Sequence, residues 1–147
     1  MPEHCPDIAI VGGGLAGCEC ALALSRCGLT CTLYEQKPHV FSPAHASSML
    51  GELVCSNSFR SNDACESGVG LLKQEMRELG SEVMRVAAAC SVPAGKALAV
   101  DRDLFCQRLT KRVEDEPLIT LERRHISSLD APELLKKTVV IAAGPLA

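Results

Sequence analysis

Aromatic residues are scarce in this sequence. They make up 3% of its 147 residues, with one tyrosine, three phenylalanines and no tryptophan. A surface that stacks nucleic-acid bases needs several such rings, so the composition argues against a base-stacking platform within this chain. The net charge of −3 also gives no electrostatic reason to expect binding to nucleic acid or to an anionic membrane.

The sequence also lacks segments that would direct a chain into or across a membrane. The first residues, MPEHCPD, hold no basic segment followed by a long apolar one, so we expect no signal peptide. The longest apolar runs have the length of strands, far short of a membrane span. We therefore expect a cytoplasmic protein whose nine cysteines are reduced thiols.

Metal-ligand spacing is absent as well. There is no C-x-x-C, and the four histidines do not pair with cysteines at the spacing of zinc ligands, so we predict no metal site. Cys18, Cys20 and Cys27 fall in the first predicted helix, where we expect them to pack as small apolar side chains. The remaining composition, 47% apolar and 22% charged, is typical of one globular domain with a core.

The clearest pattern is a strand, turn, helix and second strand near the N-terminus. Residues 7–11 (DIAIV) predict a strand covered on both faces, and an apolar helix follows to about Cys27. Gly28 stands where a helix C-terminal glycine belongs. Residues 29–34 predict a second strand, which ends at Glu35. This order predicts an α/β fold of the Rossmann type with a parallel sheet.

The turn between the first strand and the helix carries the pattern G-x-G-x-x-G. Gly12 allows the tight turn, Gly14 lets a pyrophosphate approach the backbone, and Gly17 lets the helix pack closely on the strand. Free N–H groups in the first helical turn can hold the phosphates, and the Glu35 carboxylate can accept hydrogen bonds from ribose hydroxyls. The full context predicts a dinucleotide site, while the spacing does not separate FAD from NAD.

A long tract without periodicity, residues 36–68, follows the second strand. Loops of this length in compact domains are usually functional or disordered. The apolar residues Leu53, Val54 and Phe59 within it favour an ordered loop, which we expect to belong to the active site.

Helical patterns dominate residues 69–113, which we interpret as a helical insert. Residues 69–79 predict an amphipathic helix. One face carries Val69, Leu72, Met76 and Leu79, and the other carries Lys73, Arg77 and Gly80. Residues 91–100 have the character of a loop. A further helix, capped by Asp101 or Asp103, is expected to run to about Val113. Its inward side chains are expected to be Leu104, Phe105, Leu109 and Val113.

Two strands return within residues 117–143. Residues 118–122 predict one strand, and residues 138–142 (TVVIA) predict a last, buried one. The sequence stops three residues after Gly144, whereas such a strand in a doubly wound sheet is expected to lead into more chain. We therefore expect these residues to be the N-terminal part of a longer dinucleotide-binding protein.

Six stretches of the sequence match one protein family, in order. They are IVGGGLAGCECALAL (10–24), SPAH (42–45), ELVCSNSFRSN (52–62), GLLKQEMRELGS (70–81), CSVPAGKALAVDRDLF (90–105) and IAAGPL (141–146). On these residues the chain resembles the N-terminal part of the folate- and FAD-dependent tRNA (uracil-5-)-methyltransferases. This is the TrmFO family, related to the GidA-type tRNA-modifying flavoproteins, and it implies a GidA- and glutathione-reductase-like FAD-binding domain.

The resemblance also implies an activity. Family members take a one-carbon unit from methylenetetrahydrofolate and, with reduced FAD, deliver it as a methyl group to C5 of a uridine in the T-loop of tRNA. NAD(P)H supplies the electrons. By this resemblance the FAD pyrophosphate is held by Gly12, Gly13, Gly14, Leu15, Ala16 and Gly17. Glu35 would hold the ribose, residues 121–126 would pass near the adenine, and Gly144 would close the site.

The family motif ELVCSNS places Cys55 in the chemistry. Methylation at uracil C5 is commonly prepared by a thiolate that adds to C6, followed by loss of the C5 proton to a base. A thiol can take either part, and the residues leave open which part Cys55 takes. The resemblance implies a second cysteine further along the family chain. Without the resemblance, a buried small side chain is the ordinary interpretation of a cysteine.

Several other polar residues keep two interpretations. Asn57 and Arg60, beside Cys55, could contact flavin or phosphate, or could be solvated. His45 could carry a proton near the flavin or could only occupy a turn. The basic residues that could touch a tRNA backbone, or could form a solvated face, are Lys111, Arg112, Arg123, Arg124, Lys136 and Lys137.

Three features depart from the family pattern. Ala143 stands where the family typically has threonine, SPAH continues as ASSML rather than with a second histidine and an acid, and the later part of the family chain is absent. Two alternatives to the methyltransferase are a generic FAD-dependent oxidoreductase domain and a non-catalytic dinucleotide-binding fragment. Retention of ELVCSNS and SVPAG argues against the generic oxidoreductase, because neither segment is needed to bind FAD.

Overall fold

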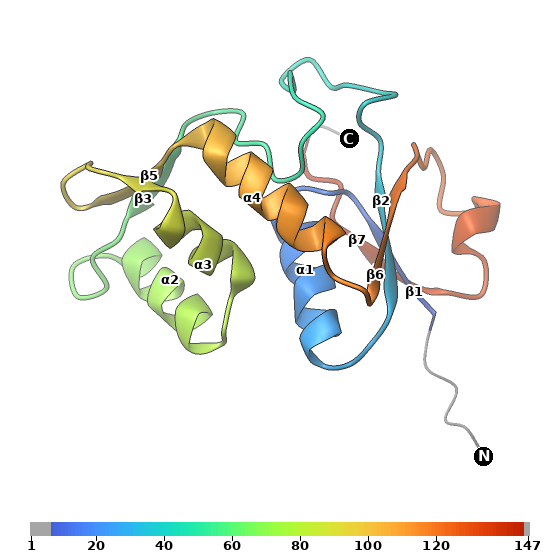
Figure 1. Ribbon diagram of the computed structural model, residues 1–147, viewed down its shortest axis with the longest axis horizontal. Helices are drawn as coiled ribbons and strands as arrows, with labels where there is room; N and C mark the ends of the chain where they lie inside the picture. The colour runs from blue at the N-terminus through green and yellow to red at the C-terminus, as the bar shows by residue number, and fades with distance from the viewer. Residues whose placement is uncertain (1–6, 146–147) are drawn as a thin grey trace.

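The computed structural model describes residues 7–145. Four strands form a parallel sheet in the order β6–β2–β1–β7 (Figure 1). Their bounds are β1 Ile8–Val11, β2 Cys31–Glu35, β6 Ile119–Arg123 and β7 Thr138–Ile141. The predicted α/β fold with a parallel sheet is confirmed. The predicted and observed strand ends differ by one or two residues, which is usual for strand boundaries.

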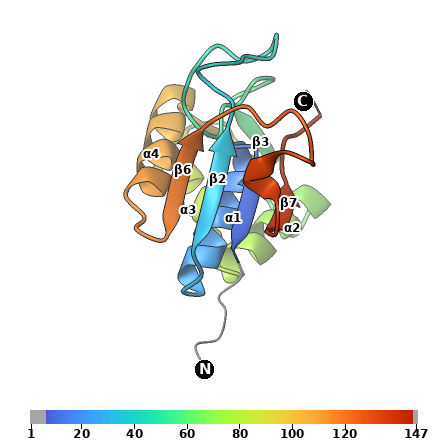
Figure 2. The same ribbon diagram turned by 90° about the vertical axis from the view of Figure 1, so that its right-hand side faces the viewer.

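Helices cover one face of this sheet. Helix α1 (Leu15–Arg26) connects β1 to β2, helix α4 (Arg102–Glu114) precedes β6, and helix α3 (Glu82–Ala89) packs against both. Figure 2 shows these helices behind the sheet, with the short 3-10 helix η1 (Pro132–Leu134) in front of it. The sheet is therefore a middle layer with a thick helical side and a thin opposite side.

Successive strand residues alternate between these two sides, as the pleat of a strand requires. Ile10 of β1 and Leu33 of β2 are fully buried and join the large core formed with α1, α3 and α4. Ala9 and Tyr34 face the opposite side, where they pack with Leu134 of η1. The prediction that the first strand is covered on both faces is confirmed.

Helix α4 has the inward face that its sequence predicts. Phe105, Leu109 and Val113 are fully buried, and Leu104 packs at the edge of the core. The Asp101 side chain accepts a hydrogen bond of 3.0 Å from the Leu104 N–H, so Asp101 is the N-cap. Burial of this face fixes α4 between the parallel sheet and the rest of the molecule.

A second sheet lies on the far side of the helices, in the left part of Figure 1. It is antiparallel, in the order β3–β5–β4. Its strands are β3 Ser58–Ser61, β4 Ser91–Val92 and β5 Ala97–Val100. The interpretation of residues 91–100 as a loop is therefore wrong, because Leu98, Ala99 and Val100 are buried as a strand. The turn residues between β4 and β5, which include Gly95 at φ +61°, concealed this short strand.

Of the apolar face predicted for helix α2 (Gly68–Glu78), only Met76 packs against the core. Leu72 is 55% exposed and Leu79 is 81% exposed, whereas Lys73 is 4% exposed. Gly70 explains the difference, because a Cβ at this position would lie 2.0 Å from the Asp63 carbonyl oxygen. The backbone approach at Gly70 selects the buried face, and Lys73 lies one turn further along it.

Strand β7 is also less buried than predicted. It pairs with β1 alone and therefore forms one edge of the described sheet. Ile141 is 56% exposed, and Val139 and Val140 are only partly buried. An apolar run of four residues identified the strand but not its place at an edge.

Candidate functional site

The glycine loop, residues 12–14, is a tight turn held by backbone contacts. Gly12 has φ +111°, and its N–H donates a 2.8 Å hydrogen bond to the Tyr34 carbonyl. A Cβ at Gly12 would lie 2.4 Å from the Ala142 carbonyl oxygen, and one at Gly17 would lie 1.8 Å from the Gly12 carbonyl oxygen. Both glycines are therefore required by the packing of strand, turn and helix.

Gly14 differs from these two glycines, because its position faces open space. It is the N-cap of α1, with φ −75° and ψ −169°, and a Cβ there would meet nothing within 4 Å. No side chain caps α1, whereas Ser67, Ser81 and Asp101 cap the other three α-helices of the described chain. The N–H groups at the start of α1 thus keep their capacity to bind an anion.

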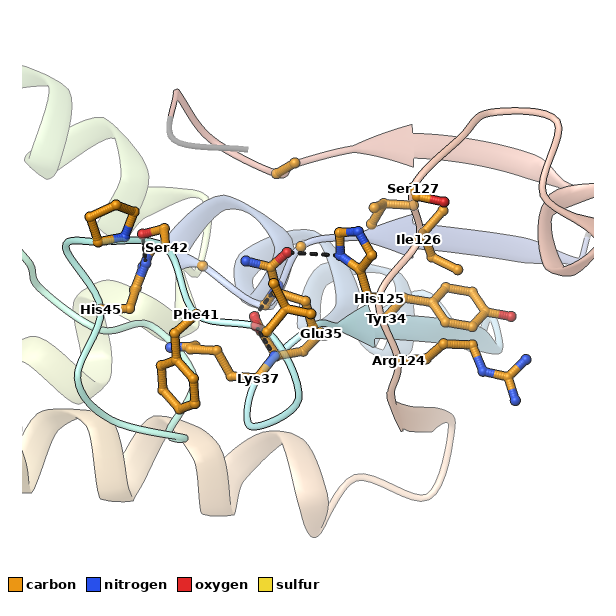
Figure 3. A pocket seen from close by; sticks show the side chains of 18 residues that line it. Tyr34, Glu35, Lys37, Phe41, Ser42, His45, Arg124, His125, Ile126 and Ser127 are labelled. Atoms are coloured by element: carbon orange, nitrogen blue, oxygen red, sulfur yellow. Dashed lines mark hydrogen bonds between the residues drawn. The ribbon is translucent and has the colours of Figure 1, made fainter.

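A cavity of about 430 Å³ opens at this end of the parallel sheet. Its lining comes from the glycine loop, from the end of β2 at Glu35, and from two chain segments, 40–45 and 124–127 (Figure 3). These are the carboxyl ends of parallel strands and the segments that follow them, where ligands of open α/β sheets bind. The volume lies within the range of small-molecule and cofactor sites.

Glu35 lies at the end of β2 with its carboxylate against the glycine loop. Only 6% of the residue is exposed. Its Oε2 accepts a 2.9 Å hydrogen bond from the Gly13 N–H, and its Oε1 accepts one of 2.9 Å from the Lys37 N–H. Each carboxylate oxygen has two acceptor positions, so the group retains capacity for hydroxyl donors from a ligand.

Two histidines line opposite walls of the cavity, and each is hydrogen-bonded to another side chain (Figure 3). His45 Nδ1 lies 2.6 Å from Ser42 Oγ, and His125 Nδ1 lies 3.0 Å from Gln36 Oε1. The pairing of His45 within a turn leaves both sequence interpretations of this residue open. His125 falls within residues 121–126, the segment that the resemblance places near the adenine, and Arg124, His125 and Ile126 line the cavity. Gln36 was not singled out from the sequence, because it lies in no recognisable motif.

The remaining sequence-predicted site residues lie at different distances from this cavity. Gly12, Gly13, Gly14 and Glu35 line it, whereas Leu15, Ala16, Gly17, Gly144 and Cys55 do not. Gly144 has φ +78° and follows Ala143, which does line the cavity. Leu146, the last residue of the IAAGPL segment, lies outside the described residues.

Cys55 is exposed, so its interpretation as a buried packing residue is wrong. It lies just before β3, where Asn57 donates a 3.2 Å hydrogen bond from Nδ2 to the Val100 carbonyl. By contrast, burial raises the pKa of Cys18 to about 12 and that of Cys31 to about 11. Cys18 confirms the predicted packing role, whereas Cys27 is exposed at the C-cap of α1. An exposed thiol is the form that reaction with an external substrate needs.

Most of the basic residues considered for a tRNA backbone have local acidic partners. Lys111 lies 2.8 Å from Asp115, and Arg112 lies 2.9 Å from Glu116. Further pairs join Arg123 to Glu114, Arg124 to Glu133 and Lys137 to Asp7. Five of the six positive charges are thus paired with an acid of their own element or its neighbour, and Lys136 is exposed. This local pairing favours the interpretation without tRNA contact.

The described part of the chain contains neither a cluster of metal ligands nor a helix that could span a membrane. Among residues 7–145, no group of three or more His, Cys, Asp or Glu side chains could hold a metal ion. No helix in the same range has the length and apolar character needed to cross a membrane.

Comparison with known families identifies the chain. Residues 7–147 match the family model described as glucose inhibited division protein A, or GidA. The chain belongs to the GidA family. The family resemblance inferred from the sequence motifs is confirmed.

Curated relatives share high identity with this GidA-family chain. A protein of Nitratidesulfovibrio vulgaris (strain Hildenborough), named methylenetetrahydrofolate–tRNA-(uracil-5-)-methyltransferase TrmFO, is 67% identical over 140 residues. The match covers 95% of this chain and 29% of that protein. A protein of the same name from Oleidesulfovibrio alaskensis is 66% identical, covering 95% and 31% respectively. The chain thus spans about a third or less of the length of these relatives.

The fold is shared with a solved member of the GidA family. The structure of GidA from Aquifex aeolicus, in its form II crystal, matches with a TM-score of 0.62 at 17% identity. The match covers 80% of this chain and 19% of that one. This agreement supports the parallel-sheet architecture described above.

Proposed function

We propose that this chain forms the FAD-binding part of a cytoplasmic enzyme that methylates C5 of a uridine in the T-loop of tRNA. Methylenetetrahydrofolate provides the one-carbon unit and NAD(P)H the electrons. The observation that carries the proposal is the cavity beside the uncapped start of α1, with the Glu35 carboxylate on its wall. The names of the relatives at 66–67% identity supply the reaction.

The residues around the cavity fit a dinucleotide. A pyrophosphate needs backbone N–H donors without a Cβ in front of them, and the open space at Gly14 meets this need. An adenosine ribose needs an acceptor for its hydroxyls, and Glu35 is placed beside the glycine loop to provide it. Bound FAD would supply, in its reduced form, the reducing equivalents that turn a methylene unit into a methyl group.

Each predicted site residue has a proposed task. Residues 12–17 hold the pyrophosphate: Gly12 and Gly13, whose N–H groups donate to Tyr34 and Glu35, shape the turn, and N–H groups of residues 14–17 face the phosphates. Glu35 orients the ribose, and Gly144 closes the site. The segment 121–126 passes near the adenine. Cys55 acts on the uracil, either as the thiolate that adds to C6 and makes C5 nucleophilic, or as the base that removes the C5 proton.

A chimera tests this proposal. These 147 residues would replace the matching part of the Nitratidesulfovibrio vulgaris relative, and T-loop uridine methylation would be assayed with methylenetetrahydrofolate, FAD and NAD(P)H. We expect methylated tRNA from the chimera, as from the unaltered relative. NAD(P)H oxidation without methylation would favour the generic oxidoreductase, and absence of both would favour a non-catalytic fragment.

A further inference from the structure

The segment that leads to Cys55 is packed directly against the glycine loop. We call residues 42–55 the Cys55 loop. The Gly51 N–H donates a 2.9 Å hydrogen bond to the Gly13 carbonyl. Leu50 is fully buried, and its N–H donates a 2.8 Å hydrogen bond to Thr110 Oγ1 of α4. The Cys55 loop therefore has a defined place between the cavity and α4.

A buried ion pair fixes the same loop from its other side. Lys37 is 3% exposed, and its Nζ donates hydrogen bonds of 2.7 Å to the Met49 carbonyl and 3.2 Å to Glu52 Oε2. The Glu52 side chain is only 11% exposed. Both residues that accept from Lys37, Met49 and Glu52, belong to the Cys55 loop, and Glu52 stands three residues before Cys55.

The second oxygen of Glu52 holds the chain within the loop. Oε1 accepts hydrogen bonds from the Ala46 N–H at 2.9 Å and from the Ser47 N–H at 3.1 Å. Burial by itself would raise the pKa of Glu52, but these hydrogen bonds and Lys37 outweigh it, so the pKa lies below its usual value. Glu52 is thus held as a carboxylate that accepts hydrogen bonds from Ala46, Ser47 and Lys37.

Lys37 also connects this network to the dinucleotide cavity. Its backbone N–H donates to Glu35 Oε1 at 2.9 Å, while its ammonium group reaches Glu52. Figure 3 shows Lys37 beside Glu35 at the cavity wall. Arg123, at the end of β6, adds a 2.7 Å hydrogen bond to the Ser48 carbonyl. One lysine therefore links the carboxylate on the cavity wall to the carboxylate at the base of the Cys55 segment.

We propose that Lys37 and Glu52 are positioning residues that hold the Cys55 loop against the glycine loop, so that Cys55 keeps a fixed place relative to the dinucleotide cavity. This assignment rests on the proposed function for its catalytic consequence. A buried ion pair is seldom worth more to stability than a well-packed apolar pair, because both charges lose hydration. The directional contacts of Lys37 and Glu52 give the pair a geometric role instead.

Three variants of the chimera test the proposal: Lys37→Met, Glu52→Gln and the double variant. Glutamine keeps an oxygen for Ala46 and Ser47, so Glu52→Gln removes the charge while retaining an acceptor. In each variant we expect kcat for tRNA methylation to fall roughly 10- to 100-fold, as misplacement of a reacting group does. KM for tRNA should change by less than about twofold, and flavin content should be retained.

Hydrogen exchange provides the readout that does not depend on activity. Amides of residues 46–51 should exchange about tenfold faster or more in the variants, while amides of β1 and β2 keep their protection. Because the two residues act as a unit, the double variant should resemble the worse single variant rather than add both losses. The control is Lys96→Met, which removes exposed ion pairs with Asp63 and Glu66 away from the Cys55 loop and should change neither measurement.

Two results would overturn the assignment. Unchanged kcat and unchanged exchange in residues 46–51 would show that the pair holds nothing in place. Equal acceleration of exchange in β1 and β2 would show a general loss of stability. If the unaltered chimera does not methylate tRNA, the proposed function fails, while the exchange measurement still decides whether Lys37 and Glu52 hold the loop.

Discussion

A substitution at Gly14 is expected to change ligand binding without changing the stability of the fold. Its backbone is extended, with φ −75°, and a side chain would point into open space. Gly14→Val should therefore leave the unfolding midpoint of the chain nearly unchanged. The valine methyl groups would stand where a pyrophosphate approaches α1, so we expect flavin affinity to fall by more than about tenfold.

Flavin fluorescence titration, with urea unfolding of the same samples, measures both effects. Gly17→Ala is the matched comparison, because its Cβ would lie 1.8 Å from the Gly12 carbonyl oxygen. This variant should lose at least about 2 kcal/mol of unfolding free energy. Full flavin binding by a folded Gly14→Val chain would remove the phosphate site from the start of α1.

Cys55 carries the second prediction at this scale. In the chimera, Cys55→Ala should abolish methyl transfer to tRNA and leave bound flavin unchanged, because the thiol acts on the uracil and does not line the cavity. Cys65→Ala is the control, since Cys65 is also exposed but lies outside the family motif. Methyl transfer that survives in Cys55→Ala would remove this residue from the chemistry.

The residues that the sequence identified are those with fixed spacing. Gly12, Gly14, Gly17 and Glu35 follow from the strand–turn–helix pattern and were found without the structure. Lys37 and Glu52 have no such signal, because they meet across a loop whose path depends on many tertiary contacts. Only the position of Glu52 at the start of ELVCSNS could have drawn attention to it.

At the scale of elements, α2 shows how a local feature overrides an apolar pattern. The Lys73 Nζ donates hydrogen bonds of 2.8 Å to the Phe59 carbonyl and 3.0 Å to the Val69 carbonyl. Lys73→Ala should reduce the unfolding free energy by about 1–3 kcal/mol, because two partly buried hydrogen bonds from a buried side chain are lost. Leu72→Gln, on the exposed face, should change it by less than about 0.5 kcal/mol.

Chemical unfolding of both variants measures this difference. A larger loss in Leu72→Gln than in Lys73→Ala would contradict the observed orientation of α2. The sequence predicted the existence of α2 and α4 equally well, but it predicted the buried face only for α4. Close contact at Gly70 is a backbone effect, and hydrophobic periodicity does not report it.

For the whole molecule, carboxyl groups with lowered pKa values set the response to acid. Hydrogen bonds from Arg112 lower the pKa of Glu116, and the pKa of Glu52 is also below its usual value. Such groups contribute stability above the unfolded pKa of about 4.3, and that contribution is lost as the pH falls through the folded pKa. We therefore expect the free energy of unfolding to decrease from about pH 5 toward pH 3.

Urea unfolding at a series of pH values measures this slope. Glu52→Gln should flatten the slope in the same range, because the glutamine does not titrate. A slope that is identical in Glu52→Gln and the unaltered chain would show that Glu52 has the same pKa in the folded and unfolded states.

The architecture of the whole molecule was predictable where elements are long and buried, and less so where they are short. The parallel sheet followed from strands such as Ile8–Val11, whose residues alternate between two covered faces. The antiparallel sheet was missed, because β4 has two residues and β3 lies within a serine-rich tract. The pairing of β3 with β5 also spans α2 and α3, so no local pattern reports it.

We propose that this chain builds a dinucleotide site at the start of α1. The most direct test is titration of the purified 147-residue chain with FAD, followed by absorbance and flavin fluorescence, with circular dichroism to verify folding. We expect saturable binding of one FAD per chain. A chain with the circular dichroism spectrum of a folded α/β protein that binds no FAD would contradict it.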